Sequence, residues 1–275
     1  MDQTTTPPTG SGASDAHHVM AILGASMRDP ALSGGCPLLA ELFDAIAEED
    51  AAQSLLQATP QWKIPGLLLS AALLHRAAAD PQHPLARHLP GRDAPLDGTF
   101  RAAVREAIVA DDAALGALMS KHTYQCNPPR RLAVSLVVLA AATADWQRRP
   151  FLHVDVGTAS GIGLLLGQVR VLSGAASLGP SAAQLELPIE LRGAALDLGA
   201  LHCPQIERAV GIDLDPPDLR DPECRAWIRA CQFAIAAEWD FFDRAVDRVL
   251  EQRPRIERGS ATDWLPRLAR EMPAG

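Results

Sequence analysis

The sequence predicts an α/β fold in which a helical N-terminal layer precedes a partial, Rossmann-like parallel sheet. Two observations carry this prediction. From about residue 36 to 146 the apolar residues recur mostly at helical spacing, and from residue 151 onward short apolar runs alternate with helical segments. The order strand, helix, strand, helix, strand favours a parallel sheet with right-handed crossovers. We therefore divide the chain into a disordered tail (1–18), a helical domain (19–150) and an α/β domain (151–275).

Composition and charge narrow the functional class. The 275 residues are 48% hydrophobic and 21% charged, as is usual for a soluble globular chain. The net charge of −8 argues against general nucleic-acid binding and against docking on an anionic membrane. The apolar runs near 64–74 and 132–142 are too short to span a bilayer and no signal segment opens the chain, so we expect a cytoplasmic protein. Five cysteines without a Cys-x-x-Cys spacing predict neither a disulfide framework nor a metal site.

Apolar spacing predicts four helices in the N-terminal half, at about 36–49, 65–79, 99–120 and 130–146. The 65–79 segment is nearly all apolar, so we expect it to be buried. It should end before Asp80-Pro81, because the residue before proline avoids the helical region. Proline and glycine then predict a long loop over 80–98, in which His83 and His88 are surface or lid histidines.

The C-terminal half alternates between strand and helix patterns. Alternating Leu185, Leu187 and Ile189 indicate a strand or hairpin arm, which Pro188 restricts to a sheet edge. Asp221 is expected to cap one long helix that ends before Pro254, and the stretch 173–205 would bulge out as a flap. The predicted elements are strands at 151–156, 184–193, 208–216 and 255–257, and helices at 160–172, 221–253 and from about 261.

A glycine-rich turn follows the first of these strands and predicts a cofactor pocket. The strand leads to Asp155, and Gly157, Gly161 and Gly163 come directly after it. Glycine allows a tight turn and a close approach of the backbone to a ligand, and the amides that open the next helix would point at that ligand. Asp213 ends the next parallel strand, at the edge of the sheet where α/β proteins bind ligands.

This turn resembles those of two cofactor-binding families. Short-chain dehydrogenases share the glycine spacing, but they need a Tyr-x-x-x-Lys pair downstream. Here no lysine follows Tyr124, the single tyrosine, so NAD(P) is the weaker alternative. The turn is also similar to that of class I S-adenosylmethionine-dependent methyltransferases. That resemblance implies cofactor contacts at Asp155, Gly157, Thr158 and Gly161, a ribose contact at Asp213, and an adenine contact at Ser260 within Gly259-Ser260-Ala261.

A wider resemblance covers about residues 35–268. The stretches CPLLAELFDAIAEED, QCNPPRR, DVGTASGIGLLL and GIDLDPPDLRDPECRAWIRA are similar to an uncharacterised bacterial family, domain of unknown function 2332, whose C-terminal half is methyltransferase-like. Two departures stand out. The family's glutamate after Gln125-Cys126-Asn127 is Pro128 here, and its third-strand aspartate is Ser260.

The resemblance leaves two functions open. The first is an S-adenosylmethionine-binding methyltransferase whose acceptor is unknown, with Gln125, Asn127 and Arg131 as candidates for a catalytic role. Methyl transfer needs mainly alignment of donor and nucleophile, so no catalytic triad is expected. The second is a non-catalytic relative that acts as a binding or assembly module, in which Asn127 simply caps the helix that follows. The missing polar residues favour the second function.

The number of strands leads to one more expectation. The predicted sheet is truncated after its third strand, so strands lie on only one side of the 151–156 strand. A bare apolar edge invites pairing with another chain. We therefore expect that edge to be covered, either by the 184–192 segment or by a second copy in a homo-oligomer.

Overall fold

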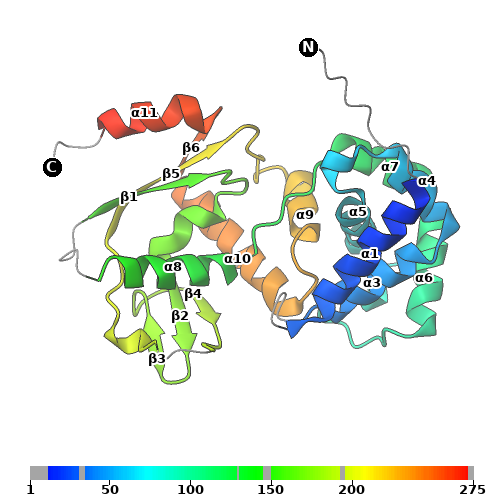
Figure 1. Cartoon of the computed structure of the whole chain (residues 1–275), viewed down its shortest axis with the longest axis horizontal. Helices are drawn as coiled ribbons and strands as arrows, with labels where there is room; N and C mark the ends of the chain where they lie inside the picture. The colour runs from blue at the N-terminus through cyan, green and yellow to red at the C-terminus, as the bar shows by residue number, and fades with distance from the viewer. Residues whose placement is uncertain (1–11, 31–34, 129, 145–149, 193–195, 272–275) are drawn as a thin grey trace, which may run out of the picture. The chain divides into compact units, whose positions relative to one another are not determined.

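The computed structural model describes residues 12–30, 35–128, 130–144, 150–192 and 196–271. The chain divides into two compact units, and each is described by itself (Figure 1). The helical unit comprises Met1–Tyr124 with Phe233–Ala236, and the α/β unit comprises Gln125–Gln232 with Ala237–Gly275. The fold is therefore of the α/β class, with a helical N-terminal part and a parallel three-stranded sheet.

The helical unit is a bundle around α5 (Pro65–Ala79), whose side chains are buried almost all the way round. This helix has the predicted bounds. Its Pro65 starts the first turn, where the missing N–H costs nothing, and the helix ends at the residue before Asp80-Pro81. The other members are α1 (Gly12–Arg28), α3 (Pro37–Ala47), α4 (Asp50–Ala58), α6 (Gly98–Ala110) and α7 (Asp112–Lys121), with short 3₁₀ turns at Gln61–Lys63 and Ala86–His88.

Three expectations for this unit need correction. The 99–120 helix is broken at Asp111, whose carboxylate is held by Arg76 at 2.9 Å. The tail predicted for 1–18 already contains the start of α1 at Gly12, and residues 1–11 lie outside the described part. His83 and His88 are 7% and 3% exposed, so they belong to the interior and not to the surface of the 80–98 loop.

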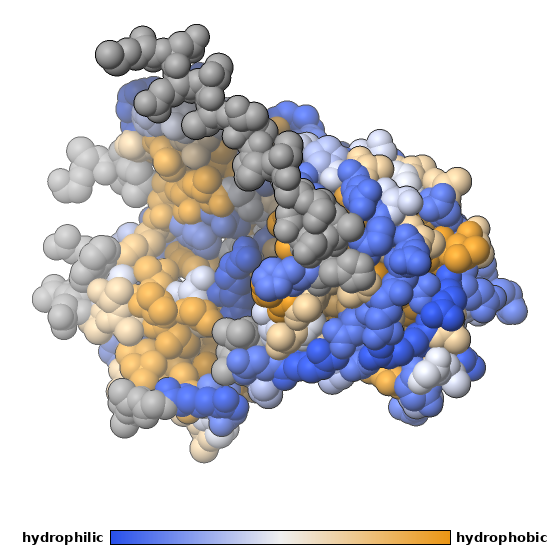
Figure 2. Space-filling view, turned by 45° about the vertical axis from the view of Figure 1, so that its right-hand side comes forward, coloured by the Kyte–Doolittle hydropathy of each residue, from blue (hydrophilic) through white to orange (hydrophobic). Residues whose placement is uncertain are grey.

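Ion pairs lie on the surface of the helical unit. Arg28 of α1 pairs with Glu41 and Asp44 of α3, and Arg101 of α6 pairs with Glu41 and Glu48. Much of the surface that this unit turns toward the viewer in Figure 2 is accordingly hydrophilic. None of the helices in the described ranges has the length and apolarity that crossing a membrane requires.

The main sheet of the α/β unit is parallel, with strand order β1-β5-β6. The three strands are β1 (Phe151–Val156), β5 (Ile206–Asp213) and β6 (Arg255–Arg258), and all three were predicted. β1 therefore lies at an edge, and none of the described strands pairs with its outer side. In particular, the 184–192 segment does not cover this edge, so the first of the two proposed covers is wrong.

Side-chain alternation gives the sheet two different faces. Leu152 and Val154 of β1 pack with Val210 and Ile212 of β5 against one helix, α11 (Ala261–Glu271), through its Leu268 and Trp264. In Figure 1 this helix lies above the sheet, and α8 (Arg130–Ala142) lies on its other side. Because side chains alternate along a strand, His153 and Asp155 point to that second face.

The segment after the glycine turn differs from the expected helix at 160–172. A short 3₁₀ helix, η3 (Ile162–Gln168), leads into β2 (Val169–Ser173), because the Val-Arg-Val alternation from Val169 favours an extended backbone. β2 pairs with β3 (Ala176–Leu178) and β4 (Leu185–Pro188) in a second sheet of order β3-β2-β4. Pro188 thus lies on an edge strand, as predicted, and the insertion continues to a 3₁₀ turn at Leu198–Ala200.

The predicted continuous helix from Asp221 to Pro254 is two helices, α9 (Pro222–Ala230) and α10 (Ala236–Gln252). Asp221 does cap α9, because its side chain accepts a hydrogen bond from the Glu223 amide at 3.0 Å. At the break, the buried side chain of Gln232 turns back and donates to the Ile228 carbonyl at 2.7 Å.

Candidate functional site

The glycine turn after β1 is closed by hydrogen bonds to the neighbouring strand. The amides of Gly157 and Thr158 both donate to the carbonyl oxygen of Ile212 in β5, at 2.8 and 3.3 Å. Gly157 and Gly161 have φ angles of +71° and +74°, which glycine adopts without strain. The non-glycine Ala159 has a φ of +45° and is therefore strained. The turn thus has the sharp geometry that the sequence predicted, although a 3₁₀ helix and not an α-helix follows it.

The two acids that end β1 and β5 meet at this turn. Asp213 accepts hydrogen bonds from the amides of Ala159 (2.8 Å) and Asp215 (2.9 Å), one on each carboxylate oxygen. Asp155 accepts one from the hydroxyl of Thr158 at 2.8 Å. A carboxylate oxygen has two lone pairs, so these bonds position the acids and leave each oxygen able to accept another donor.

The glycines near Asp155 and Asp213 differ in what an added side chain would contact. A side chain at Gly163 would collide with the Asp155 carboxylate, so this glycine makes room for the acid and not for a ligand backbone. A side chain at Gly211 would likewise collide with Thr158. At Gly157 a Cβ would meet nothing within 4 Å, which leaves open space on the outer side of the turn.

Asn127 joins the segment before α8 to the turn. Its amide nitrogen donates to the Thr158 carbonyl at 3.2 Å, and its amide oxygen accepts from Arg131 at 3.3 Å. Since α8 begins at Arg130, Asn127 connects two parts of the site instead of capping the helix as one alternative proposed. Asn127 and Arg131 therefore lie together with Asp155 and Thr158. The backbone of Gln125 bonds to the buried Cys231, and no contact of its side chain with these residues is seen among the described residues.

Gln232 supports this connection and was missed in the sequence. It is 1% exposed, and its side-chain oxygen accepts from the Asn127 backbone amide at 3.2 Å. Its other end is anchored on Ile228. The two partners are far apart in sequence, and no spacing pattern could have indicated that Gln232 fixes Asn127.

Ser260 has a structural position. Its hydroxyl oxygen accepts from the Thr262 amide at 3.2 Å and lies 2.7 Å from the Thr262 hydroxyl, at the start of α11. The preceding Gly259 donates its amide to the Asp213 carbonyl at 2.8 Å, so the end of β6 is tied to the end of β5. Ser260 thus lies at the carboxyl edge of the sheet as predicted, with its hydroxyl engaged in the helix start.

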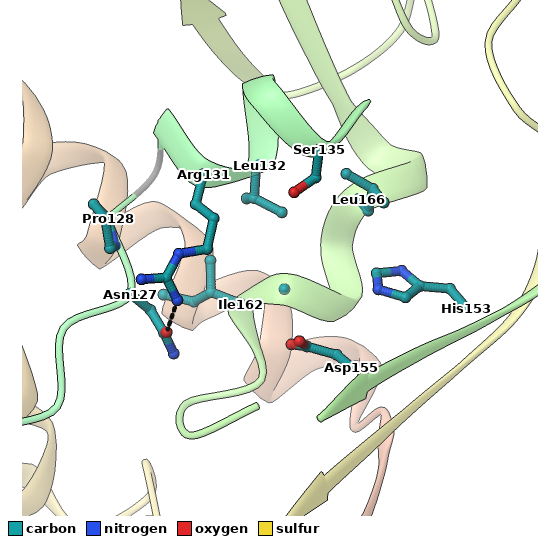
Figure 3. Close-up of a pocket in the computed structure, with 10 residues that line it drawn as sticks. Asn127, Pro128, Arg131, Leu132, Ser135, His153, Asp155, Ile162 and Leu166 are labelled. Carbon is teal, nitrogen blue, oxygen red and sulfur yellow. Dashed lines mark hydrogen bonds between the residues drawn. The ribbon is translucent and has the colours of Figure 1, made fainter. Parts of the chain in front are cut away.

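A cavity of about 70 Å³ lies between α8, β1 and η3 (Figure 3). Asn127 and Arg131 line one side and His153 and Asp155 the other, with the apolar Ile162 between them. Sequence reasoning missed His153. The available signal was its position two residues before Asp155 on a single strand, which places both side chains on one face. The remaining lining residues are Pro128, Leu132, Ser135, Gly163 and Leu166.

The polar groups of this site are only partly satisfied. The buried Nδ1 of His153 and the buried hydroxyl of Ser160 in the turn lack a hydrogen-bond partner within the described residues. Burial lowers the pKa of His153 below its ordinary 6.5, and the nearby Asp155 opposes this shift with a smaller effect. The imidazole is therefore neutral at pH 7. Within the same described ranges, Arg131 forms no salt bridge, and no cluster of three or more His, Cys, Asp or Glu side chains could hold a metal ion.

A comparison of the sequence with family models identifies the family of this chain. A family model described as "Uncharacterized protein conserved in bacteria (DUF2332)" matches residues 28–275. The chain is a member of this family. No curated protein and no solved structure matches the sequence.

Proposed function

We propose that the α/β unit binds S-adenosylmethionine at the carboxyl edge of the β1-β5-β6 sheet and is a methyltransferase relative. One observation carries the proposal. Asp155 is the penultimate residue of β1 and Asp213 is the last residue of the adjacent parallel strand β5, and the glycine turn that follows β1 bonds to both strands. The carboxyl edge of a parallel sheet, with acids and a sharp glycine turn, is where such folds bind nucleosides.

The residues at this edge are suited to an adenosyl group. The Asp213 oxygens each keep a lone pair for a ribose hydroxyl, and the open side of Gly157 lets a ligand approach the backbone. Val156, the last residue of β1, and Leu214, which follows β5, are 55% and 75% exposed and offer apolar surface to a base. When bound, the cofactor would supply an electrophilic methyl group. The protein's contribution would be to align it with an acceptor.

The cavity beside β1 is too small for the whole cofactor. Pockets that enclose ligands of this size measure roughly 300–1,000 Å³, whereas this cavity measures about 70 Å³. The proposal therefore places the adenosyl group along the open edge and leaves the cavity for a smaller molecule.

Calorimetry with S-adenosylmethionine and its demethylated product tests the proposal. We expect saturable binding that weakens by about tenfold or more in Asp213→Ala, because charge-assisted hydrogen bonds contribute roughly 1.5–3 kcal/mol. Asp213 also holds the Ala159 amide, so this variant should also lose some thermal stability. Asp218→Ala is the matched control, since Asp218 pairs with Arg220 outside the site. No heat of binding to the unmutated protein at millimolar ligand would refute the proposal.

A second function, a non-catalytic binding or assembly module, is favoured by the unpaired edge of β1. Exposed strand edges recruit other strands, and none of the described strands pairs with this one. Under this alternative we expect a homo-oligomer in light scattering after gel filtration, with no affinity for S-adenosylmethionine. A monomer that binds the cofactor would exclude it.

A further inference from the structure

The cavity between α8 and β1 has opposite charges on opposite walls. Arg131 approaches from the N-terminal turn of α8, and Asp155 approaches from the end of β1 with His153 beside it (Figure 3). Leu132, Ile162 and Leu166 form the apolar part of the lining. Arg131 is exposed at the mouth of the cavity and Asp155 is half-buried, so the apolar walls lower the local dielectric constant mainly around Asp155.

Each wall matches one end of an α-amino acid. The planar fork of a guanidinium fits a carboxylate with two parallel hydrogen bonds, and Arg131 has no competing carboxylate among the described residues. Asp155 keeps free lone pairs beyond its bond to Thr158, so it can accept from an ammonium group. The volume of about 70 Å³ has room for roughly five water-sized centres, about the number of non-hydrogen atoms in glycine.

His153 can accept a proton inside this cavity. Its ring is directed toward the cavity in Figure 3, and it is neutral at pH 7 because burial lowers its pKa. A neutral imidazole with an unpartnered nitrogen can accept a proton from an ammonium group, and because its lowered pKa makes this transfer uphill, the methyl transfer that consumes the free amine must draw it forward.

We propose that this cavity is the acceptor site and that it takes a small α-amino acid. This inference rests on the proposed function, which supplies the methyl donor. Arg131 holds the carboxylate, Asp155 holds the ammonium, and His153 removes one proton from it. The free amine lone pair then forms a bond to the methyl carbon while the carbon–sulfur bond breaks and its electron pair stays on sulfur. The products are an N-methyl amino acid and the demethylated cofactor, and His153 returns its proton to water.

Nuclear magnetic resonance of the His153 imidazole in the full protein tests the binding step without any turnover. We expect glycine to shift this resonance at concentrations on the order of 10 mM, where a millimolar site is mostly filled. Acetate lacks the amine and methylamine lacks the carboxylate, so each should bind about tenfold or more weakly than glycine. Arg131→Gln should weaken glycine binding by about tenfold, whereas Arg220→Gln, an exposed arginine paired with Asp218, should not change it.

The outcomes separate this inference from the proposed function. If S-adenosylmethionine binds but glycine never shifts His153, the acceptor site is wrong and the proposed function stands. If glycine binds and the cofactor does not, the proposed function is wrong, and the acceptor role falls with it. If S-adenosylmethionine displaces glycine, the cavity holds the amino-acid end of the cofactor, and the acceptor assignment is overturned. Simultaneous binding of both, with N-methylglycine formed by the wild type and lost in His153→Gln, is the expected result.

Discussion

The two units each contain an arginine, an aspartate and a histidine close together, and the arginines of the two clusters are paired differently. In the helical unit Arg76 is paired with Asp111 at 2.9 Å, and His83 lies 3.4 Å from the same carboxylate while its Nδ1 accepts the Leu85 amide. In the α/β unit Arg131 contacts an amide oxygen, and the Nδ1 of His153 has no partner among the described residues. The Nε2 of His83 also lacks a hydrogen-bond partner among the described residues, so the two clusters differ chiefly in their arginines: Arg76 is paired with a carboxylate, and Arg131 is not.

This difference separates stabilising polar groups from functional ones. Pairing and hydrogen bonding within the fold offset the desolvation penalty of a charged group. Such a group has few hydrogen-bonding positions free for a ligand. A buried polar atom without a partner is costly unless something else supplies one. We therefore interpret the Arg76–Asp111–His83 cluster as a clamp that fixes the loop before α6. The Arg131–Asp155–His153 cluster is where a ligand is expected.

A core substitution in the helical unit has the largest expected effect on stability. Leu73 in α5 is completely buried. Leu73→Ala should lower the free energy of unfolding by about 2–5 kcal/mol, because it removes buried surface and leaves a cavity. Binding of S-adenosylmethionine to the folded protein should stay unchanged, as measured by calorimetry below the unfolding transition. Cofactor affinity that falls with stability would show that the binding site also depends on the helical unit.

A matched pair of glycines tests the turn itself. Gly157 and Gly174 both have positive φ angles, +71° and +57°, and at neither position would an added Cβ meet another atom within 4 Å. Valine at either position should therefore cost a similar amount of stability, roughly 1–3 kcal/mol of backbone strain. Only Gly157→Val should abolish cofactor binding, because Gly174 lies in the turn between β2 and β3. Equal affinities in the two variants would exclude the outer side of the turn as the ligand site.

The sequence predicts the features that depend on residues close together in the chain. It does not predict those that depend on residues brought together only by folding. Apolar periodicity acts over one helix turn, and it correctly predicted α5 and the three strands of the main sheet. At the break between α6 and α7, Asp111 contacts Arg76, and after α9 the Gln232 side chain folds back on Ile228. Those contacts, like the one between Gln232 and Asn127, join residues whose proximity exists only after folding.

The site shows the same limit. The positions of Asp155, Gly157 and Asp213 at the strand ends and the turn were predictable, because strand ends and glycine turns have local signatures. That the Asp213 carboxylate would hold the Ala159 amide was not, since the two belong to different strands. The role of Gly163 was misjudged for a similar reason. Its neighbour in space is the Asp155 side chain, so the need for glycine comes from packing and not from a ligand.

A comparison of the two histidines by pH gives the smallest expected effect. Burial lowers the pKa of both His83 and His153 below 6.5, so the unfolded chain binds protons more readily than the folded protein does. Stability should be unaffected above that pH and should fall as the pH drops through 6.5 toward the folded-state values. His83→Gln and His153→Gln should each reduce part of this loss of stability in urea unfolding measured from pH 7.5 to 5.

Added glycine should distinguish the two histidine variants. It should stabilise the wild type and His83→Gln near neutral pH, because ligand binding to the folded state adds stability, and it should stabilise His153→Gln less. If glycine has the same effect on both variants, the two histidines are equivalent structural residues, and the contrast between the two clusters does not hold.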